Sequence, residues 1–227
     1  MLRQATLTAL VLLTSLFTLS AADAPIVDLG YVKYSGFQNT TAGINYYRAI
    51  PYAVPPLGNL RWRQPSPIEL NNTFNGQVIN ASEYGPACYQ GFPPYATTGS
   101  YATWLNLTQS EDCLVLNVLV PMNPVSSHLP VVVLLHGGGF VLGSPQTVAP
   151  GDAFVNASNG NVIYVEVQYR LGMFGFLAGQ QIMEDGVANA GLLDQRAALN
   201  WVQQYIFAFG GDPSRVTVSG EFASYLN

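Results

Sequence analysis

The chain has 227 residues, of which 49% are hydrophobic and 9% charged, and its formal net charge at pH 7 is -5. This composition excludes an intrinsically disordered protein, because disordered chains combine low hydrophobicity with high charge. The eight lysines and arginines are scattered along the chain, so the sequence predicts no nucleic-acid partner and no binding to an anionic membrane surface.

Residues 1–22 have the layout of a secretory signal peptide. Arg3 precedes an apolar stretch at residues 9–19, and small residues follow at 20–22. We place the cleavage after Ala22, with an uncleaved N-terminal anchor as the alternative. No second apolar stretch of about 18 residues follows. We therefore expect residues 23–227 to form a secreted, extracellular chain without a membrane span.

Glycosylation signals and the cysteine count agree with export. An even count of two cysteines in an exported chain favours a disulfide between Cys88 and Cys113 over two buried free thiols. Five Asn-X-Ser/Thr tripeptides have no proline at the middle position, which makes them candidate glycosylation sites. These candidates are Asn39, Asn71, Asn80, Asn106 and Asn156.

The first elements after the signal are short. Residues 26–34 and 43–50 carry β-formers between glycines, which predicts antiparallel strands in a peripheral hairpin. Residues 51–110 are rich in Pro, Asn, Gly and Tyr without a sustained period, which indicates long ordered loops. The tyrosines and phenylalanines of residues 84–104 either line a gorge or pack these loops.

The second half of the chain has the pattern of an α/β unit. Strands are predicted at residues 114–120, 131–135 and 162–167, and the last two are apolar enough to be buried on both faces. A helix is predicted around residues 190–207, with Gln195 on its polar side and a strand after it at 215–219. The order strand, helix, strand implies an α/β fold with a parallel sheet and a crossover connection.

A glycine-rich loop follows the strand at 131–135. Residues 136–140 read His-Gly-Gly-Gly-Phe, an arrangement that supplies backbone N–H donors to the oxyanion hole of ester hydrolases. Gly138 and Gly139 have no side chains that would block an approaching carbonyl oxygen. A merely structural turn is the alternative, and the sequence shows no phosphate or dinucleotide motif around these glycines.

The strand at 215–219 runs into an incomplete nucleophile motif. A nucleophile elbow reads Gly-X-Ser-X-Gly, and residues 220–224 read Gly-Glu-Phe-Ala-Ser. Phe222 thus occupies the nucleophile position, and its side chain has no oxygen or sulfur for covalent acyl transfer. Ser224 lies two residues too late and has no following glycine.

Six stretches in the same order, the glycine-rich loop among them, make the chain resemble the type B carboxylesterase and lipase family, relatives of the cholinesterases with an α/β-hydrolase fold. The resemblance spans most of the mature chain and implies the N-terminal part of that fold, truncated after the elbow strand, with a mixed, mostly parallel sheet. The stretches are residues 49–62, 110–118, 136–140, 167–176, 191–195 and 209–213.

The resemblance assigns roles to individual residues. It implies an oxyanion hole from the N–H groups of Gly138, Gly139 and Ala223, and it places His136 in the oxyanion loop rather than as the catalytic base. His128 matches no functional position. It also implies the disulfide Cys88–Cys113 and the structural ion pairs Arg61–Glu111 and Arg170–Asp194.

The expected function of the complete family fold is acyl transfer from a small-molecule or lipid ester through a serine nucleophile, with no metal or organic cofactor. In the family the acid and the histidine of the triad lie downstream of the elbow. We expect this chain itself to be inactive, because those residues and the serine are missing from its sequence. The alternatives are an inactive cholinesterase-like binding or adhesion protein and a non-functional remnant. The sequence leaves the ester and the oligomeric state open.

Overall fold

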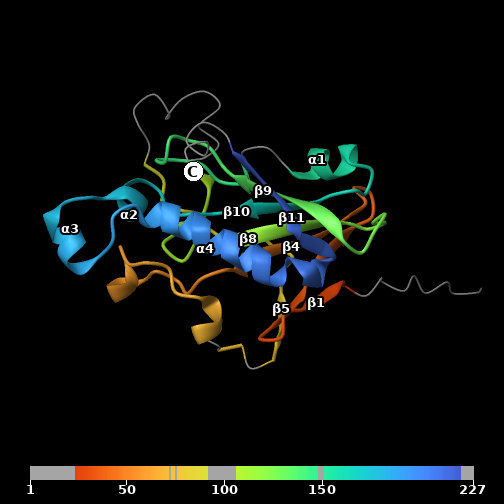
Figure 1. Cartoon of the computed structure of the whole chain (residues 1–227), viewed down its shortest axis with the longest axis horizontal. Coiled ribbons are helices and arrows are strands. Elements are labelled where there is room, and N and C mark those ends of the chain that lie inside the picture. Colours follow the sequence, from red (N-terminus) through yellow and green to blue (C-terminus); the bar gives the residue numbers. More distant parts are fainter. Residues whose placement is uncertain (1–23, 72, 75, 92–105, 148–150, 221–227) are drawn as a thin grey trace, which may run out of the picture.

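The computed structural model describes residues 24–220 apart from residues 72, 75, 92–105 and 148–150. A six-stranded sheet with the order β11-β9-β10-β8-β4-β3 forms the centre, and α4 crosses it (Figure 1). The strands are β1 (Ile26–Asp28), β2 (Lys33–Ser35), β3 (Phe37–Asn39), β4 (Ile44–Pro51), β5 (Val78–Asn80), β6 (Ala87–Cys88), β7 (Gln109–Ser110), β8 (Val115–Pro121), β9 (Leu129–Leu135), β10 (Ile163–Val167) and β11 (Gly211–Gly220). The helices are α1 (Gly151–Ala157), α2 (Gly172–Phe176), α3 (Gln180–Asp185) and α4 (Ala190–Tyr205), with short 3-10 helices at Gly58–Leu60, Ile68–Asn71 and Ile206–Phe209.

The sheet is mixed, as predicted. β9 pairs in parallel with both β10 and β11, whereas the pairs β10–β8, β8–β4 and β4–β3 are antiparallel. Among the described strands, parallel pairs are therefore fewer than in the mostly parallel sheet that was expected. The two parallel pairs follow the connections after β9 and β10, which carry helices α1 to α4 and are long enough for the crossover that parallel strands need.

The peripheral hairpin differs from the prediction. Residues 26–35 form their own hairpin, β1 with β2, which extends through β5 into a separate three-stranded sheet. The expected partner segment at 43–50 instead becomes β4 in the central sheet, next to β8. Burial explains this placement, because Ile44, Tyr46 and Ile50 are almost completely buried in that position.

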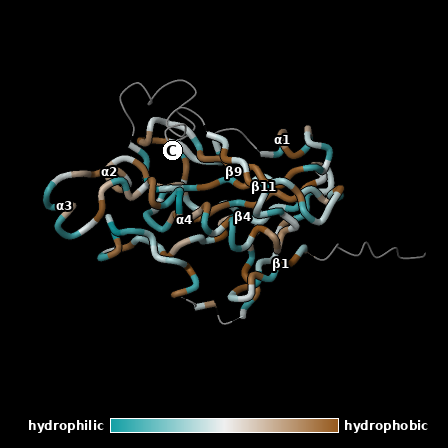
Figure 2. Tube along the Cα trace, in the orientation of Figure 1, coloured by the Kyte–Doolittle hydropathy of each residue, from teal (hydrophilic) through white to brown (hydrophobic). Residues whose placement is uncertain are grey.

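Both faces of the sheet are covered, which is why its central strands are so apolar. On one face Val131 and Val133 of β9 share a core cluster with Trp201 and Val202 of α4. On the other face Tyr164 of β10 shares a second cluster with residues of β4 and α1. The trace of α4 alternates between hydrophilic and hydrophobic residues (Figure 2), as its position between sheet and solvent requires.

One residue of α4 departs from its predicted face. Gln195 was expected on the polar side, yet it is only 2% exposed. Asn200, Gln203 and Gln204 are exposed as predicted. The reason is that other chain segments pack around the first turns of α4. Gly191, one turn before Gln195, lies against the Arg170 carbonyl and the Phe176 ring. These segments also bury side chains that the apolar pattern of the helix places on its polar side.

Candidate active site

The carboxyl end of β9 lies between two parallel neighbours. In open α/β sheets ligands bind outside the carboxyl ends of the strands, where loops converge. Residues 136–140 leave β9 at this edge, directly after Leu135. The register pairs Gly220 of β11 with Leu135, so the chain leaves β11 beside the start of the glycine-rich loop. Gly220, the first residue of the incomplete nucleophile motif, therefore lies at the same edge of the sheet as the start of the glycine-rich loop.

The glycine-rich loop is shaped by two residues with positive φ. Gly138 has a φ of 114°, and a Cβ there would lie 1.9 Å from the carbonyl oxygen of Leu142. Gly139 has a φ of 63°, and a Cβ there would meet no atom within 4 Å. Within the described part of the chain, neither N–H donates a hydrogen bond. Both donors are therefore available to an incoming oxygen, and Gly139 faces open space.

Phe140 adds backbone strain to this loop. Its φ of 63° lies in the left-handed region, which a bulky residue rarely adopts. Two contacts hold it there. Its ring lies 4.7 Å from that of Phe176, and its carbonyl accepts a hydrogen bond from the Gly172 N–H at 2.7 Å. Such strained residues cluster at functional sites, where the surrounding structure maintains them.

His136 is a buried structural residue of the loop. Its ring stacks on Tyr169 with the centroids 4.4 Å apart, and the Tyr169 hydroxyl donates to the His136 carbonyl at 2.6 Å. Burial lowers the pKa of His136 to about 4, against the opposing effect of its hydrogen bond to the Gly137 carbonyl. The ring is therefore neutral at pH 7. His128 is exposed, and its Nδ1 lies 3.0 Å from the hydroxyl oxygen of Ser127.

The pair Arg170–Asp194 links the end of β10 to α4. The Arg170 Nε and Nη2 donate to the two carboxylate oxygens of Asp194, both at 2.7 Å, and the Arg170 backbone N–H donates to the same carboxylate at 3.1 Å. Nη2 also donates to the Arg63 carbonyl at 2.8 Å. The side chains are 3% and 0% exposed. This pair therefore holds α4, which covers one face of the sheet, against the segment that follows β10.

Arg61 and Glu111 form the other expected pair. The Arg61 Nε and Nη2 donate to the two oxygens of Glu111, both at 2.5 Å. The hydrogen bond to this carboxylate raises the pKa of Arg61. Arg61 is 36% exposed, so solvent screens the interaction and its contribution to stability is small.

The structure contains the disulfide Cys88–Cys113, which closes a loop across 25 residues. We expect the double variant Cys88→Ala/Cys113→Ala to lower the free energy of unfolding by about 3 kcal/mol, because the open loop regains conformational entropy in the unfolded chain. Urea denaturation monitored by circular dichroism measures this change. A loss below about 1 kcal/mol would show that the disulfide does not constrain the unfolded chain as described.

Glu166 is a buried carboxyl group that the sequence motifs did not predict. It is 1% exposed, and it accepts hydrogen bonds from the Asn117 Nδ2 at 3.0 Å and from the Gly151 N–H at 3.2 Å. Burial raises the pKa of Glu166 from 4.5 to about 7, although both hydrogen bonds oppose this shift. The folded chain therefore holds this proton more tightly than the unfolded chain.

This raised pKa predicts a pH-dependent stability. The contribution of Glu166 is most favourable below about pH 4.5 and is lost as the pH rises through about 7, by something on the order of 3 kcal/mol. We expect the stability difference between Glu166→Gln and the parent to shift in favour of the variant between pH 4.5 and 7.5. Comparing the two urea midpoints cancels the titration of all other groups. A difference that does not change with pH would contradict the raised pKa.

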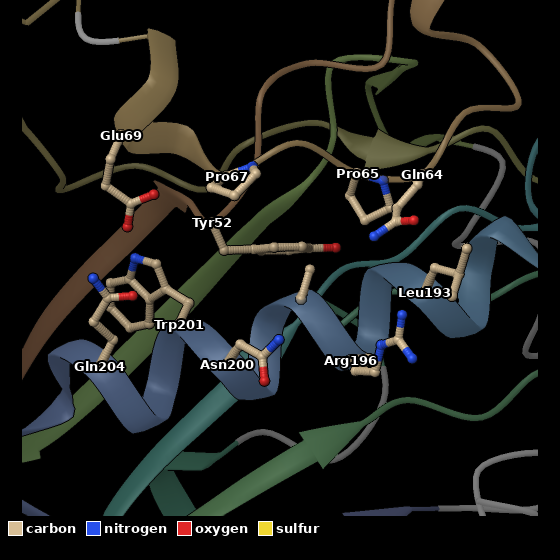
Figure 3. A pocket seen from close by; sticks show the side chains of 11 residues that line it. Tyr52, Gln64, Pro65, Pro67, Glu69, Leu193, Arg196, Asn200, Trp201 and Gln204 are labelled. Atoms are coloured by element: carbon tan, nitrogen blue, oxygen red, sulfur yellow. The ribbon is translucent and has the colours of Figure 1, made fainter.

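A cavity of about 290 Å³ lies between α4 and residues 64–69 (Figure 3). Its lining includes Tyr52 and Trp201 together with the charged Arg196 and Glu69. Glu69 also accepts a short hydrogen bond from the Tyr205 hydroxyl. No residue of the glycine-rich loop lines this cavity, so the cavity is separate from the edge of the sheet where that loop begins.

The candidate glycosylation sites differ in their exposure to solvent. Asn80, Asn106 and Asn156 are exposed and Asn39 is half-buried, whereas the side chain of Asn71 lies outside the described part. Residues 1–22, Phe222, Ala223 and Ser224 also lie outside it.

Among the residues that are described, no three His, Cys, Asp or Glu side chains gather into a possible metal site. In the same residues no helix has the length and hydropathy needed to cross a membrane.

Comparisons with known proteins agree with this geometry. A model of the carboxylesterase family matches residues 23–223. The chain is 44% identical over 203 residues to the para-nitrobenzyl esterase of Bacillus subtilis, covering 89% of this chain and 39% of that protein. It is 38% identical over 224 residues to secreted lipase 1 of Botryotinia fuckeliana, covering 91% and 38%. The solved structure of EstA from Aspergillus niger matches with a TM-score of 0.72 at 36% identity, covering 87% of this chain and 36% of that one.

The sheet order and the glycine-rich loop at the end of β9, together with this structural match, define an α/β-hydrolase fold. The chain belongs to the carboxylesterase family. It spans about two fifths of the length of the curated relatives that it matches.

Proposed function

We propose that residues 23–220 supply the oxyanion-stabilising half of a serine carboxylic ester hydrolase. The observation that carries this proposal is the register of β11 on β9, which brings the chain out of β11 beside a loop whose Gly138 and Gly139 N–H groups have no partner among the described residues. An ester carbonyl at this edge would meet both donors as its oxygen becomes negative. The family membership supports the same chemistry.

The proposed reaction is acyl transfer. A serine oxygen attacks the ester carbonyl carbon while the catalytic histidine accepts the serine proton, and the N–H groups of Gly138, Gly139 and Ala223 stabilise the oxyanion. The alcohol leaves with a proton from the catalytic histidine, and water then hydrolyses the acyl-enzyme. Phe222 stands at the nucleophile position in this sequence, so this step requires a serine that the chain does not have. We propose that the chain is inactive unless position 222 carries serine and the triad is complete.

The test is a fusion of residues 23–220 to the C-terminal part of the Bacillus subtilis para-nitrobenzyl esterase, beginning at its nucleophile elbow. One version carries serine at the nucleophile position and the other carries phenylalanine. We expect the serine fusion to hydrolyse p-nitrophenyl acetate and to react with a fluorophosphonate probe, and the phenylalanine fusion to do neither. A folded serine fusion without activity would refute the proposal, as would equal activity of both versions.

Phe222 also supports a second candidate, a binding protein that retains the fold without catalysis. The two candidates differ in the phenylalanine fusion, which would then bind an ester analogue without turnover. Isothermal titration with a non-hydrolysable ester analogue measures this binding. No heat of binding to a folded phenylalanine fusion would eliminate the second candidate.

We further propose that the protein is secreted and glycosylated, on the basis of residues 1–22 and the exposed Asn80, Asn106 and Asn156. Expression in a eukaryotic secretory host should yield an extracellular chain that begins at Asp23 and loses mass on treatment with an N-glycosidase. A retained chain that still carries residues 1–22 would contradict cleavage.

A further inference from the structure

Gln90 lies between the disulfide and the glycine-rich loop, two residues after Cys88. Its side-chain Oε1 accepts a hydrogen bond from the Gly143 N–H at 2.6 Å, and its Nε2 donates to the Gly143 carbonyl at 3.0 Å. Nε2 also donates to the Cys88 carbonyl at 2.8 Å. One amide side chain thus satisfies both backbone groups of a single residue, as a neighbouring strand would.

Gly143 lies directly against the start of the loop. Its φ is 127°, and a Cβ there would lie 2.3 Å from both the Gly137 carbonyl oxygen and the Nδ1 of His136. A shift of Gly143 therefore displaces the residues that precede Gly138. The next residue after Gln90 makes a second contact, because the Gly91 N–H donates to the Val141 carbonyl at 2.6 Å. Residues 90 and 91 thus hold the segment that directly follows the glycine-rich loop at two points, Gly143 and Val141.

Gln90 is itself anchored. Its backbone N–H donates to the Oε1 of Gln109 at 3.0 Å. Gln109 belongs to β7, which pairs with β6, the strand that ends two residues before Gln90. The disulfide joins Cys88 of β6 to Cys113. A continuous set of bonds therefore runs from the disulfide through Gln90 to Gly143 and the loop.

We propose that Gln90 is a positioning residue for the oxyanion hole: its amide holds Gly143, and through it the loop, in the conformation that presents the N–H groups of Gly138 and Gly139. This inference rests on the proposed ester hydrolase function. Only an amide side chain carries both a donor and an acceptor in this geometry. A carboxylate at this position would face the carbonyls of Gly143 and Cys88 and repel them, and asparagine is one methylene too short.

The first test is hydrogen–deuterium exchange of the full chain and of the variants Gln90→Ala and Gln90→Glu. We expect the amides of residues 137–143 to exchange at least about tenfold faster in both variants, with α4 unchanged. Gln203→Ala, which removes an exposed glutamine of α4, is the matched control and should leave the loop unchanged. Unchanged loop exchange, or equal acceleration of the loop and α4, would overturn the proposal.

The second test uses the serine fusion and separates this inference from the function on which it rests. We expect Gln90→Ala to lower kcat by about tenfold to a hundredfold with little change in KM, because the misplaced donors act on the transition state. An inactive parent fusion counts against the proposed function. An active parent whose kcat is unaffected by Gln90→Ala, or whose KM alone rises, counts against the positioning role.

Discussion

Asp194→Asn is expected to lower the free energy of unfolding by about 3 to 5 kcal/mol. The substitution preserves the shape of the side chain but leaves the guanidinium of Arg170, which is 3% exposed, without a charged partner. The amide nitrogen would also face donors of Arg170 where carboxylate oxygens accept three hydrogen bonds. Urea denaturation of the chain at pH 7 measures the loss.

The exposed pair Arg63–Asp185 provides the matched control. Asp185 is 85% exposed and lies 2.8 Å from the Arg63 guanidinium. Asp185→Asn removes the same charge from a solvated ion pair, so it should change the free energy of unfolding by less than about 1 kcal/mol. Equal effects of the two substitutions would show that burial of the Arg170–Asp194 pair does not determine its contribution.

Gly138→Ala is expected to lower kcat of the serine fusion by about 10² to 10³, the loss typical of a missing oxyanion donor. The new Cβ would overlap the Leu142 carbonyl oxygen, which lies 1.9 Å from its position. The turn must then open, although the N–H groups of Val141 and Leu142 both donate to the Gly138 carbonyl at 3.2 Å. Steady-state hydrolysis of p-nitrophenyl acetate measures kcat, and circular dichroism checks the fold.

Gly139→Ala separates this steric effect from general strain. A Cβ at Gly139 meets no atom within 4 Å, so only the left-handed backbone disfavours it. We expect a smaller loss of kcat, on the order of tenfold. A loss at Gly139 that equals or exceeds the loss at Gly138 would contradict the described loop geometry.

The sequence predicted those features that depend on local pattern. The strands of the second half and the helix at 190–207 follow from hydrophobic runs and periodicity, and the structure places them at β8, β9, β10, β11 and α4. The glycine-rich loop was recognisable because it directly follows a buried strand. The incomplete nucleophile motif was recognisable from its Gly-Glu start directly after the strand predicted at 215–219.

Features that depend on contacts between distant segments were missed. Segment 43–50 carries the same β-formers as a peripheral strand, and only its fit beside β8 decides its sheet. Gln195 is buried by the chain segments around the start of α4, which no helical period records. Gln90 has no sequence signal, because its partner Gly143 lies 53 residues away. The role of Glu166 likewise depends on Asn117 and Gly151 from other elements.

We propose above that the loop at residues 136–140 stabilises the oxyanion of an ester hydrolase. A trifluoromethyl ketone tests it most directly, because its tetrahedral adduct with the serine carries the oxyanion itself. We expect the serine fusion to bind this inhibitor about 10² to 10³ times more tightly than its Gly138→Ala variant, in parallel with the loss of kcat. Equal affinity of the two folded proteins would show that the loop does not stabilise the oxyanion.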